Sequence, residues 1–188
     1  MTELLRKLNE KFGHAFTLRV VESDVKNAWT NGQEITFTSG ILSLLTRREA
    51  DAVMLHEFGH AHLGHTHKLQ MAFVGGWATQ STSYAGWHST GDRRWFLAFA
   101  AAFVGREVGQ SLMMKHFEYQ ADSFAVQAGY GDALASALMK ITVGHTGAFS
   151  LSHPTTERRV ARMAPADPLS AVGKVLSTVY ETAVDVMV

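Results

Sequence analysis

The chain of 188 residues contains no cysteine, which excludes disulfide bonds and any metal site built from thiolates. It is also poor in charge, because charged residues make up 18% of the sequence and 17 basic side chains balance 17 acidic ones. A formal net charge of zero gives no electrostatic reason to expect nucleic acid or an anionic membrane as the main partner. The length fits one domain with a substantial core.

Long hydrophobic runs are missing as well. The apolar segment at residues 95–105 (WFLAFAAAFVG) is far shorter than the roughly 20 residues that a membrane-crossing helix needs. We predict that it is a buried core helix; the alternative is a short element that docks on a membrane or a partner. The first 13 residues are charged and amphipathic and lack the apolar core of a signal peptide. A cytoplasmic location is therefore expected, and membrane association is not favoured.

The main feature that is present is an HExxH motif, His56-Glu57-Phe58-Gly59-His60. Positions four apart on an α-helix lie on the same face, so His56 and His60 can bind one zinc ion. Glu57 is too close in sequence to join them, but it is placed to take a proton from a metal-activated water as a general base. The chain has ten histidines, so a solvated histidine-rich helix remains the alternative interpretation.

The residues before the motif indicate a helix. Thr46 and Glu49 match a capping box, in which both side chains satisfy free N–H groups of the first turn. Apolar residues then recur at helical spacing, and no proline interrupts them. We predict a helix over residues 47–67 that holds both motif histidines, with His62 and His65 off the ligand face and solvated.

A third ligand is available downstream at Glu118, which lies four residues before Asp122 on a predicted helix. A catalytic zinc commonly has three protein ligands and one open position, so Glu118 can complete a His₂Glu set. Asp122, one turn on, can accept a hydrogen bond from the distal nitrogen of a ligand histidine. Acidic pairs are also common on solvated helix faces, but beside an HExxH helix we favour the metal-binding interpretation.

The remaining sequence predicts a mostly helical α+β fold with a small antiparallel sheet beside the HExxH helix. Residues 27–30 and 34–38 flank Asn31-Gly32, a strong hairpin signal. The glycine, serine, threonine and aromatic residues at 75–91 indicate a loop or flap near the cleft. Further helices are expected at residues 2–12, 39–45, 92–128, 133–143, 155–164 and 170–186, and a strand at 16–21.

Four segments, in this order, resemble the M48 family of zinc metallopeptidases, which includes CAAX-processing and heat-shock membrane proteases and their soluble relatives. The segments are residues 27–29 with 35–42, residues 49–60, residues 118–122, and residues 152–163, which begin Ser152-His153-Pro154. Together they cover about residues 27–163. The resemblance implies a zincin-type protease in a minimal soluble form, with a single metalloprotease domain over residues 1–188 whose core is residues 27–163.

The resemblance also implies a gluzincin site with one zinc ion per chain. His56, His60 and Glu118 would be the ligands, Glu57 the general base, and Asp122 the partner of a ligand histidine.

Three further residues are candidates for a donor to the oxyanion. They are Tyr119, His153 and Arg159, the last at the position of the family's arginine after His-Pro. His153 can alternatively act as a switch that displaces the water as a fourth ligand. The predicted helix at residues 170–186 can also block the site by covering the cleft with its apolar face. Packing of that face in the core is the favoured interpretation.

Substrate binding is expected at an edge strand, because the family counterpart of Asn27-Ala28-Trp29 lies along the cleft. An extended peptide would pair with this edge through main-chain hydrogen bonds. Packing of Trp29 in the core is an equally good interpretation of that residue. The expected activity is a zinc endopeptidase acting on extended or unfolded polypeptides; the alternative is a latent or non-catalytic zinc-binding interaction protein on the same scaffold.

Overall fold

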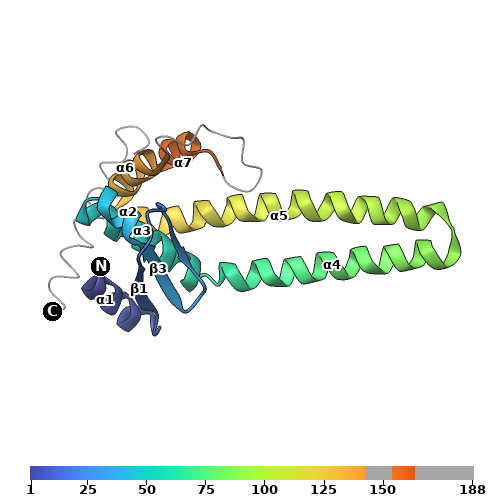
Figure 1. Ribbon diagram of the computed structural model, residues 1–188, viewed down its shortest axis with the longest axis horizontal. Coiled ribbons are helices and arrows are strands. Elements are labelled where there is room, and N and C mark those ends of the chain that lie inside the picture. Colours follow the sequence, from blue (N-terminus) through green and yellow to red (C-terminus); the bar gives the residue numbers. More distant parts are fainter. Residues whose placement is uncertain (143–153, 164–188) are drawn as a thin grey trace.

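The computed structural model describes residues 1–142 and 154–163, which form a compact body and a long projecting hairpin of two helices (Figure 1). The elements in chain order are α1 (Thr2–Phe12), β1 (Thr17–Val21), β2 (Ala28–Thr30), β3 (Glu34–Thr38), α2 (Ser39–Leu44), α3 (Arg47–His62), α4 (His65–Thr90), α5 (Arg93–Gln127), α6 (Gly131–Thr142) and α7 (Thr156–Met163). The mostly helical α+β class is confirmed. The predicted helix at residues 170–186 lies outside the described residues.

The sheet has three strands in the order β1-β3-β2. The predicted hairpin is present: β2 pairs antiparallel with β3, and Gly32 in the turn has φ of 93°, a conformation that favours glycine. The sheet is mixed rather than purely antiparallel, because β1 pairs with β3 in parallel. The fully buried Ile35 and Phe37 keep β3 in the centre, which leaves β2 with one open edge.

Helix α3 runs through the middle of the hydrophobic core, where Met54, Leu55 and Phe58 are completely buried. Its first turn is closed by the predicted capping box. The helix ends at His62, before the predicted end at residue 67, because Gly64 adopts the left-handed conformation with φ of 66°. The chain turns there and starts α4 in a new direction.

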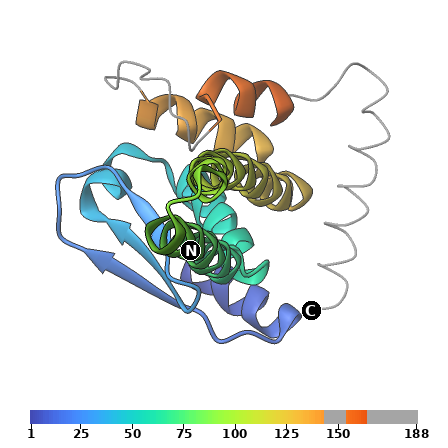
Figure 2. The same ribbon diagram turned by 90° about the vertical axis from the view of Figure 1, so that its right-hand side faces the viewer.

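The α4–α5 hairpin replaces the loop that was expected at residues 75–91, so that prediction is wrong. Figure 2 looks along the hairpin and shows the two helices one above the other, with the sheet to one side. Glycines on α4 allow the close packing: a β-carbon at Gly76 would collide with the side chain of Arg106, and one at Gly86 with the ring of Trp95. Small residues that resemble a loop composition thus serve helix contact.

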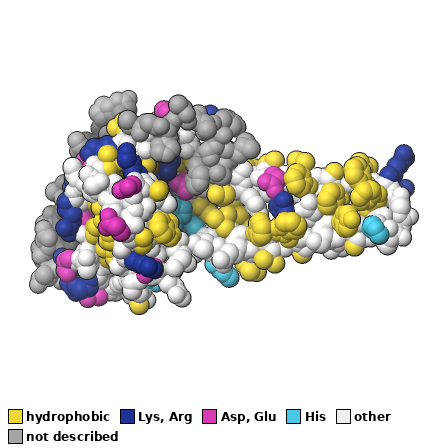
Figure 3. Space-filling view, viewed as in Figure 1, with side chains coloured by type: hydrophobic (Ala, Val, Ile, Leu, Met, Phe, Trp, Pro, Cys, Tyr) yellow, Lys and Arg dark blue, Asp and Glu magenta, His cyan; other side chains and the backbone are white. Residues whose placement is uncertain are grey.

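The prediction that residues 95–105 form a buried core helix is also wrong. They are helical, but Leu97 is 62% exposed and Val104 58% exposed, because along this stretch α5 packs mainly against α4. Figure 3 shows hydrophobic side chains over much of the hairpin. Exposed large apolar residues on α4 and α5 are Met71, Phe73, Val74, Trp77, Tyr84, Trp87, Trp95, Phe96, Leu97, Phe103, Val104, Val108, Leu112 and Val126.

Polar groups lie between the two helices of the hairpin. The guanidinium group of Arg106 donates a hydrogen bond to Gln80 (2.8 Å) and lies over the rings of Trp77 and Phe103, at 4.8 and 5.4 Å from their centroids. These contacts fix the register of α4 against α5. Among the described residues, no helix combines the length and the apolar character needed to cross a membrane.

Glu49 joins α3 to α6. Its carboxylate, buried to 5% exposure, accepts hydrogen bonds from Ser136 (2.6 Å), Lys140 (2.7 Å) and the backbone N–H of Thr46 (2.7 Å). Burial alone would raise the pKa of Glu49, but the hydrogen bonds from Lys140, Ser136 and Thr46 outweigh it and lower the pKa to about 2. Glu49 is therefore ionised at neutral pH and holds the start of α3 in place.

Replacing Glu49 with alanine should lower the free energy of unfolding at pH 7 by about 1–3 kcal/mol, because partly buried donors lose their acceptor. Since folding lowers the pKa of Glu49, its stabilisation is complete above its ordinary pKa of 4.5 and disappears as the pH falls towards 2. The difference in free energy of unfolding between wild type and Glu49→Ala should therefore be smaller at pH 3 than at pH 7. Urea denaturation at the two pH values measures it. Asp24→Ala removes an exposed carboxylate and is the control. An equal difference at both pH values would contradict the assignment.

Candidate metal centre

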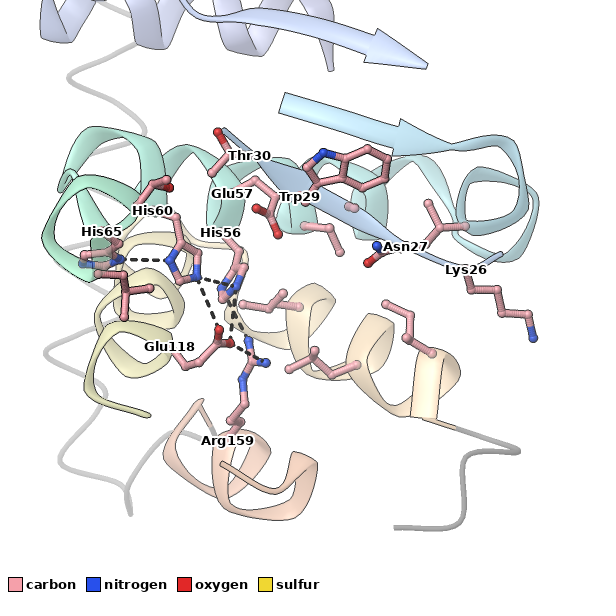
Figure 4. A pocket seen from close by; sticks show the side chains of 18 residues that line it. Lys26, Asn27, Trp29, Thr30, His56, Glu57, His60, His65, Glu118 and Arg159 are labelled. Carbon is pink, nitrogen blue, oxygen red and sulfur yellow. Dashed lines mark hydrogen bonds and ion pairs between the residues drawn. The ribbon is translucent and has the colours of Figure 1, made fainter. Parts of the chain in front are cut away.

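Three side chains from two helices meet at the base of the hairpin. His56 and His60 lie one turn apart on α3, and their Nε2 atoms are 3.1 Å apart. Glu118 comes from α5, with Oε1 3.6 Å from Nε2 of His60 and Oε2 3.7 Å from Nε2 of His56. One ligating atom from each residue lies within 4.8 Å of the other two, an arrangement that can hold a metal ion (Figure 4).

Asp122 and Arg159 lie behind these three side chains. His56 Nδ1 is 3.0 Å from Oδ1 of Asp122, one turn after Glu118 on α5. Arg159, from α7, donates to both oxygens of Asp122, from Nε at 2.9 Å and from Nη2 at 2.6 Å. Its Nη1 lies 2.9 Å from Oε2 of Glu118. A single buried guanidinium therefore connects the two carboxylates that flank His56.

The protonation states follow from burial and these contacts. Burial, reinforced by the neighbouring His56, lowers the pKa of His60 to about 3, so its ring is neutral at neutral pH. Burial opposes ionisation of Asp122, but the hydrogen bonds with His56 and Arg159 outweigh it and lower the pKa of this carboxyl group. Burial raises the pKa of Glu57, although His56 and Arg159 oppose that rise. Its carboxyl group thus holds a proton more readily than an exposed glutamate does.

His65 contacts the centre, contrary to the prediction that it is solvated. It is 1% exposed, its Nδ1 lies 2.9 Å from Nδ1 of His60, and its Nε2 lies 3.0 Å from Oε1 of Gln120. Its ring stacks on Phe117 with the centroids 4.1 Å apart, and burial lowers its pKa. Sequence reasoning missed this residue because the turn at Gly64 changes the helix axis. That glycine was the available signal.

Two other histidines near the motif lie away from the three side chains. The prediction that His62 is solvated is wrong, because His62 is half-buried and its Nδ1 lies 2.8 Å from Nε2 of His14. Both rings lie among phenylalanine side chains on the opposite side of α3 from the ligand face. His67 is exposed and does not line the cleft described next.

A cleft of about 380 Å³ opens over the three side chains. Residues 26–30, which include β2, line it together with α3, and apolar side chains of α6 complete the wall. Glu57 projects into this space beside His56, near Trp29 (Figure 4). Trp29 is 41% exposed, so the interpretation of this residue as a core side chain is wrong. Asn27, Ala28 and Trp29 all line the cleft, as the edge-strand prediction requires.

The three candidates for a donor to the oxyanion lie in different places. Arg159 lines the cleft. Tyr119 lies in a separate hollow on another face of α5, where the guanidinium of Arg162 is 4.0 Å from its ring centroid. His153 lies outside the described residues, as does the helix expected to cover the cleft.

Comparisons with known proteins agree with this arrangement. The sequence profile of Peptidase family M48 matches residues 1–166. A protease HtpX homolog from Desulfatibacillum aliphaticivorans is 28% identical over 185 residues, which cover 87% of this chain and 57% of that protein. A second, from Paraburkholderia phytofirmans, is 28% identical over 188 residues, covering 90% of this chain and 65% of its own length. The chain therefore spans less than two thirds of these two relatives.

A similar fold occurs among solved structures. The crystal structure of S. mikatae Ste24p matches with a TM-score of 0.61 at 19% identity, over 86% of this chain and 48% of that one. Identity at that level shows a shared fold alone. The family match, in contrast, takes in most of the sequence and the group of His56, His60 and Glu118. The chain belongs to peptidase family M48, a family of zinc metalloproteases.

Proposed function

We propose that this protein is a zinc endopeptidase in which His56, His60 and Glu118 hold the metal and Glu57 acts as general base. The observation that carries the proposal is the convergence of these three side chains at the floor of a cleft into which Glu57 also projects. A purely structural zinc site needs neither a base nor an open cleft, so this arrangement favours catalysis over a role in metal binding alone.

The donor set fits zinc. His56 donates its Nδ1 proton to Asp122, which leaves a lone pair on the Nε2 that faces His60. The low pKa of His60 keeps that ring neutral and able to bind a metal. Two imidazole nitrogens and one carboxylate are a common ligand set of catalytic zinc, and they leave a fourth position open.

A zinc ion in this position would lower the pKa of a bound water to about 7 and polarise the carbonyl group of a peptide. Glu57 is placed to accept the proton of the attacking water and to return it to the leaving amine. A carboxyl group whose pKa is raised by burial suits both steps, because the proton must be taken up and then released. Because water is the nucleophile, hydrolysis by this route needs no covalent enzyme intermediate.

Arg159 supports the centre by holding carboxylates. Its Nε, Nη1 and Nη2 groups are directed at Asp122 and Glu118, which favours this role over that of a donor to the oxyanion. Without the guanidinium, the two buried carboxylates would lose the positive charge that lies between them. We infer that Arg159 keeps both ionised and in the positions that the metal and His56 require.

Strand β2 offers main-chain groups to a substrate. Within the ladder, Asn31 N–H bonds to Glu34 C=O and Thr38 N–H bonds to Asn27 C=O, so odd-numbered positions of β2 face β3. The N–H and C=O groups of Ala28 and Thr30 consequently face the open edge, beside the cleft. An extended polypeptide that pairs there would lie across the metal site with its main chain held in register.

Replacing Glu57 with glutamine should reduce peptide cleavage by at least about 100-fold while zinc stays bound, because the amide cannot take up the proton. The rate of cleavage of an unfolded casein-type substrate and the zinc content of the same sample measure both quantities. Removal of the metal from wild type with a chelator is the positive control for loss of activity. Undiminished turnover by a zinc-loaded Glu57→Gln protein would refute the assignment of the base.

Replacing Ala28 with proline should lower kcat/KM for extended peptides about 2–10-fold, because it removes one N–H donor that faces the open edge and no donor of the β2–β3 ladder. Ala28→Val keeps the N–H and is the matched control. Equal kinetics for the two variants would show that substrate does not pair with β2.

Replacing Arg159 with alanine should destabilise the fold by about 3–5 kcal/mol, because two buried carboxylates lose their countercharge. Arg158→Ala, which changes the exposed arginine next to it, should stay within about 0.5 kcal/mol of wild type. Urea denaturation of the metal-free proteins gives both values. Similar losses for the two variants would show that the two carboxylates do not depend on the countercharge of Arg159.

A further inference from the structure

The two histidines of the HExxH motif are supported in different ways. His56 has a carboxylate behind it, because its Nδ1 faces Asp122 at 3.0 Å. His60 has another imidazole behind it, with the two Nδ1 atoms of His60 and His65 2.9 Å apart. Two facing ring nitrogens attract each other only if one carries a proton and the other a lone pair. The identity of the donor therefore decides which nitrogen of His60 is free for a metal.

Gln120 determines which of the two histidines donates the hydrogen bond. Its Oε1 lies 3.0 Å from Nε2 of His65, and a carbonyl oxygen accepts hydrogen bonds but never donates them. His65 must then carry its proton on Nε2, which leaves a lone pair on Nδ1. His60 consequently donates from its Nδ1 and keeps a lone pair on Nε2, the atom that faces His56 and Glu118.

The surroundings of His65 hold its ring in one orientation. The ring is 1% exposed and lies flat on Phe117, with an angle of 5° between the ring planes. Phe117 and Gln120 both belong to α5, as does Glu118, whereas the turn at Gly64 places His65 at the first position of α4. The side chain that orients His60 is thus tied to the helix that supplies the proposed third ligand.

We propose that His65 and Gln120 form a positioning relay that fixes the tautomer and ring orientation of His60 for zinc binding. The inference rests on the proposed function, because it takes His60 as a ligand. It adds that the second motif histidine depends on a neutral imidazole and an amide, while His56 depends on a carboxylate. Partners of this kind raise the affinity of a ligand histidine for metal by fixing its tautomer and the orientation of its ring.

The test is the zinc affinity of the full chain, measured by competition with a chromogenic chelator. His65→Leu keeps an apolar contact with Phe117 but removes the acceptor, and should weaken zinc binding about 10–100-fold. His65→Asn offers an amide oxygen to His60 Nδ1 and should recover most of the loss. His67→Gln, an exposed histidine two positions along α4, is the matched control and should bind zinc as wild type does.

A second pair of variants tests Gln120 separately. Gln120→Leu removes the acceptor of His65 and should weaken zinc binding, whereas Gln120→Glu keeps an acceptor and should not. Because the two residues act in series, Gln120→Leu should add nothing to the effect of His65→Leu. Additive losses, or an affinity of His65→Leu equal to that of His67→Gln, would overturn the relay.

Nitrogen-15 NMR of the imidazole rings gives a readout that needs no variant and applies if His65→Leu fails to fold. In zinc-loaded wild type the proton should lie on Nδ1 of His60 and on Nε2 of His65; a proton on Nδ1 of His65 would overturn the proposal. His60→Ala separates the two levels of inference. If it leaves zinc binding unchanged, the metal centre itself is wrong; if it abolishes binding while His65→Leu does not weaken it, only the relay is wrong.

Discussion

The guanidinium group of Arg159 lies between the carboxylates of Glu118 and Asp122, where little water can reach them. Each carboxylate has a second task, since Glu118 faces the two motif histidines and Asp122 accepts from His56. Burial of two like charges close together would ordinarily protonate one of them. The positive charge between them offsets that penalty, and the hydrogen bonds with His56 and Arg159 together hold the pKa of Asp122 low. The orientation of His56 therefore depends on a residue more than a hundred positions away in the chain.

The body of the protein is arranged so that these distant segments meet. Helix α3 lies in the centre with the sheet, α5 and α6 packed around it, and the short α7 reaches α5 to deliver Arg159. The same α3 is anchored at its start by Glu49, which binds Ser136 and Lys140 of α6. Rigid placement of α3 matters, because a displacement of its last two turns would move both motif histidines and Glu57 together.

The sequence predicted those parts of the site that depend on local periodicity. The capping box at Thr46 located the start of α3, and the spacing of four residues placed His56 with His60 and Glu118 with Asp122 on common helix faces. It failed where tertiary packing overrides composition. A glycine-rich and serine-rich stretch forms helix α4, where small residues allow close packing against α5. The apolar residues 95–105 remain exposed, because along this stretch α5 packs mainly against α4. His65 could not be placed without the turn at Gly64.

Helix α5 is continuous for 35 residues, about 50 Å at the usual rise, and it connects the far tip of the hairpin with Glu118 near its other end. Helix α4 connects His65, at its first position, with the same tip. The ends of α4 and α5 that lie at the body therefore carry His65 and Glu118. Two continuous helices thus connect the group of His56, His60 and Glu118 with a distant apolar surface.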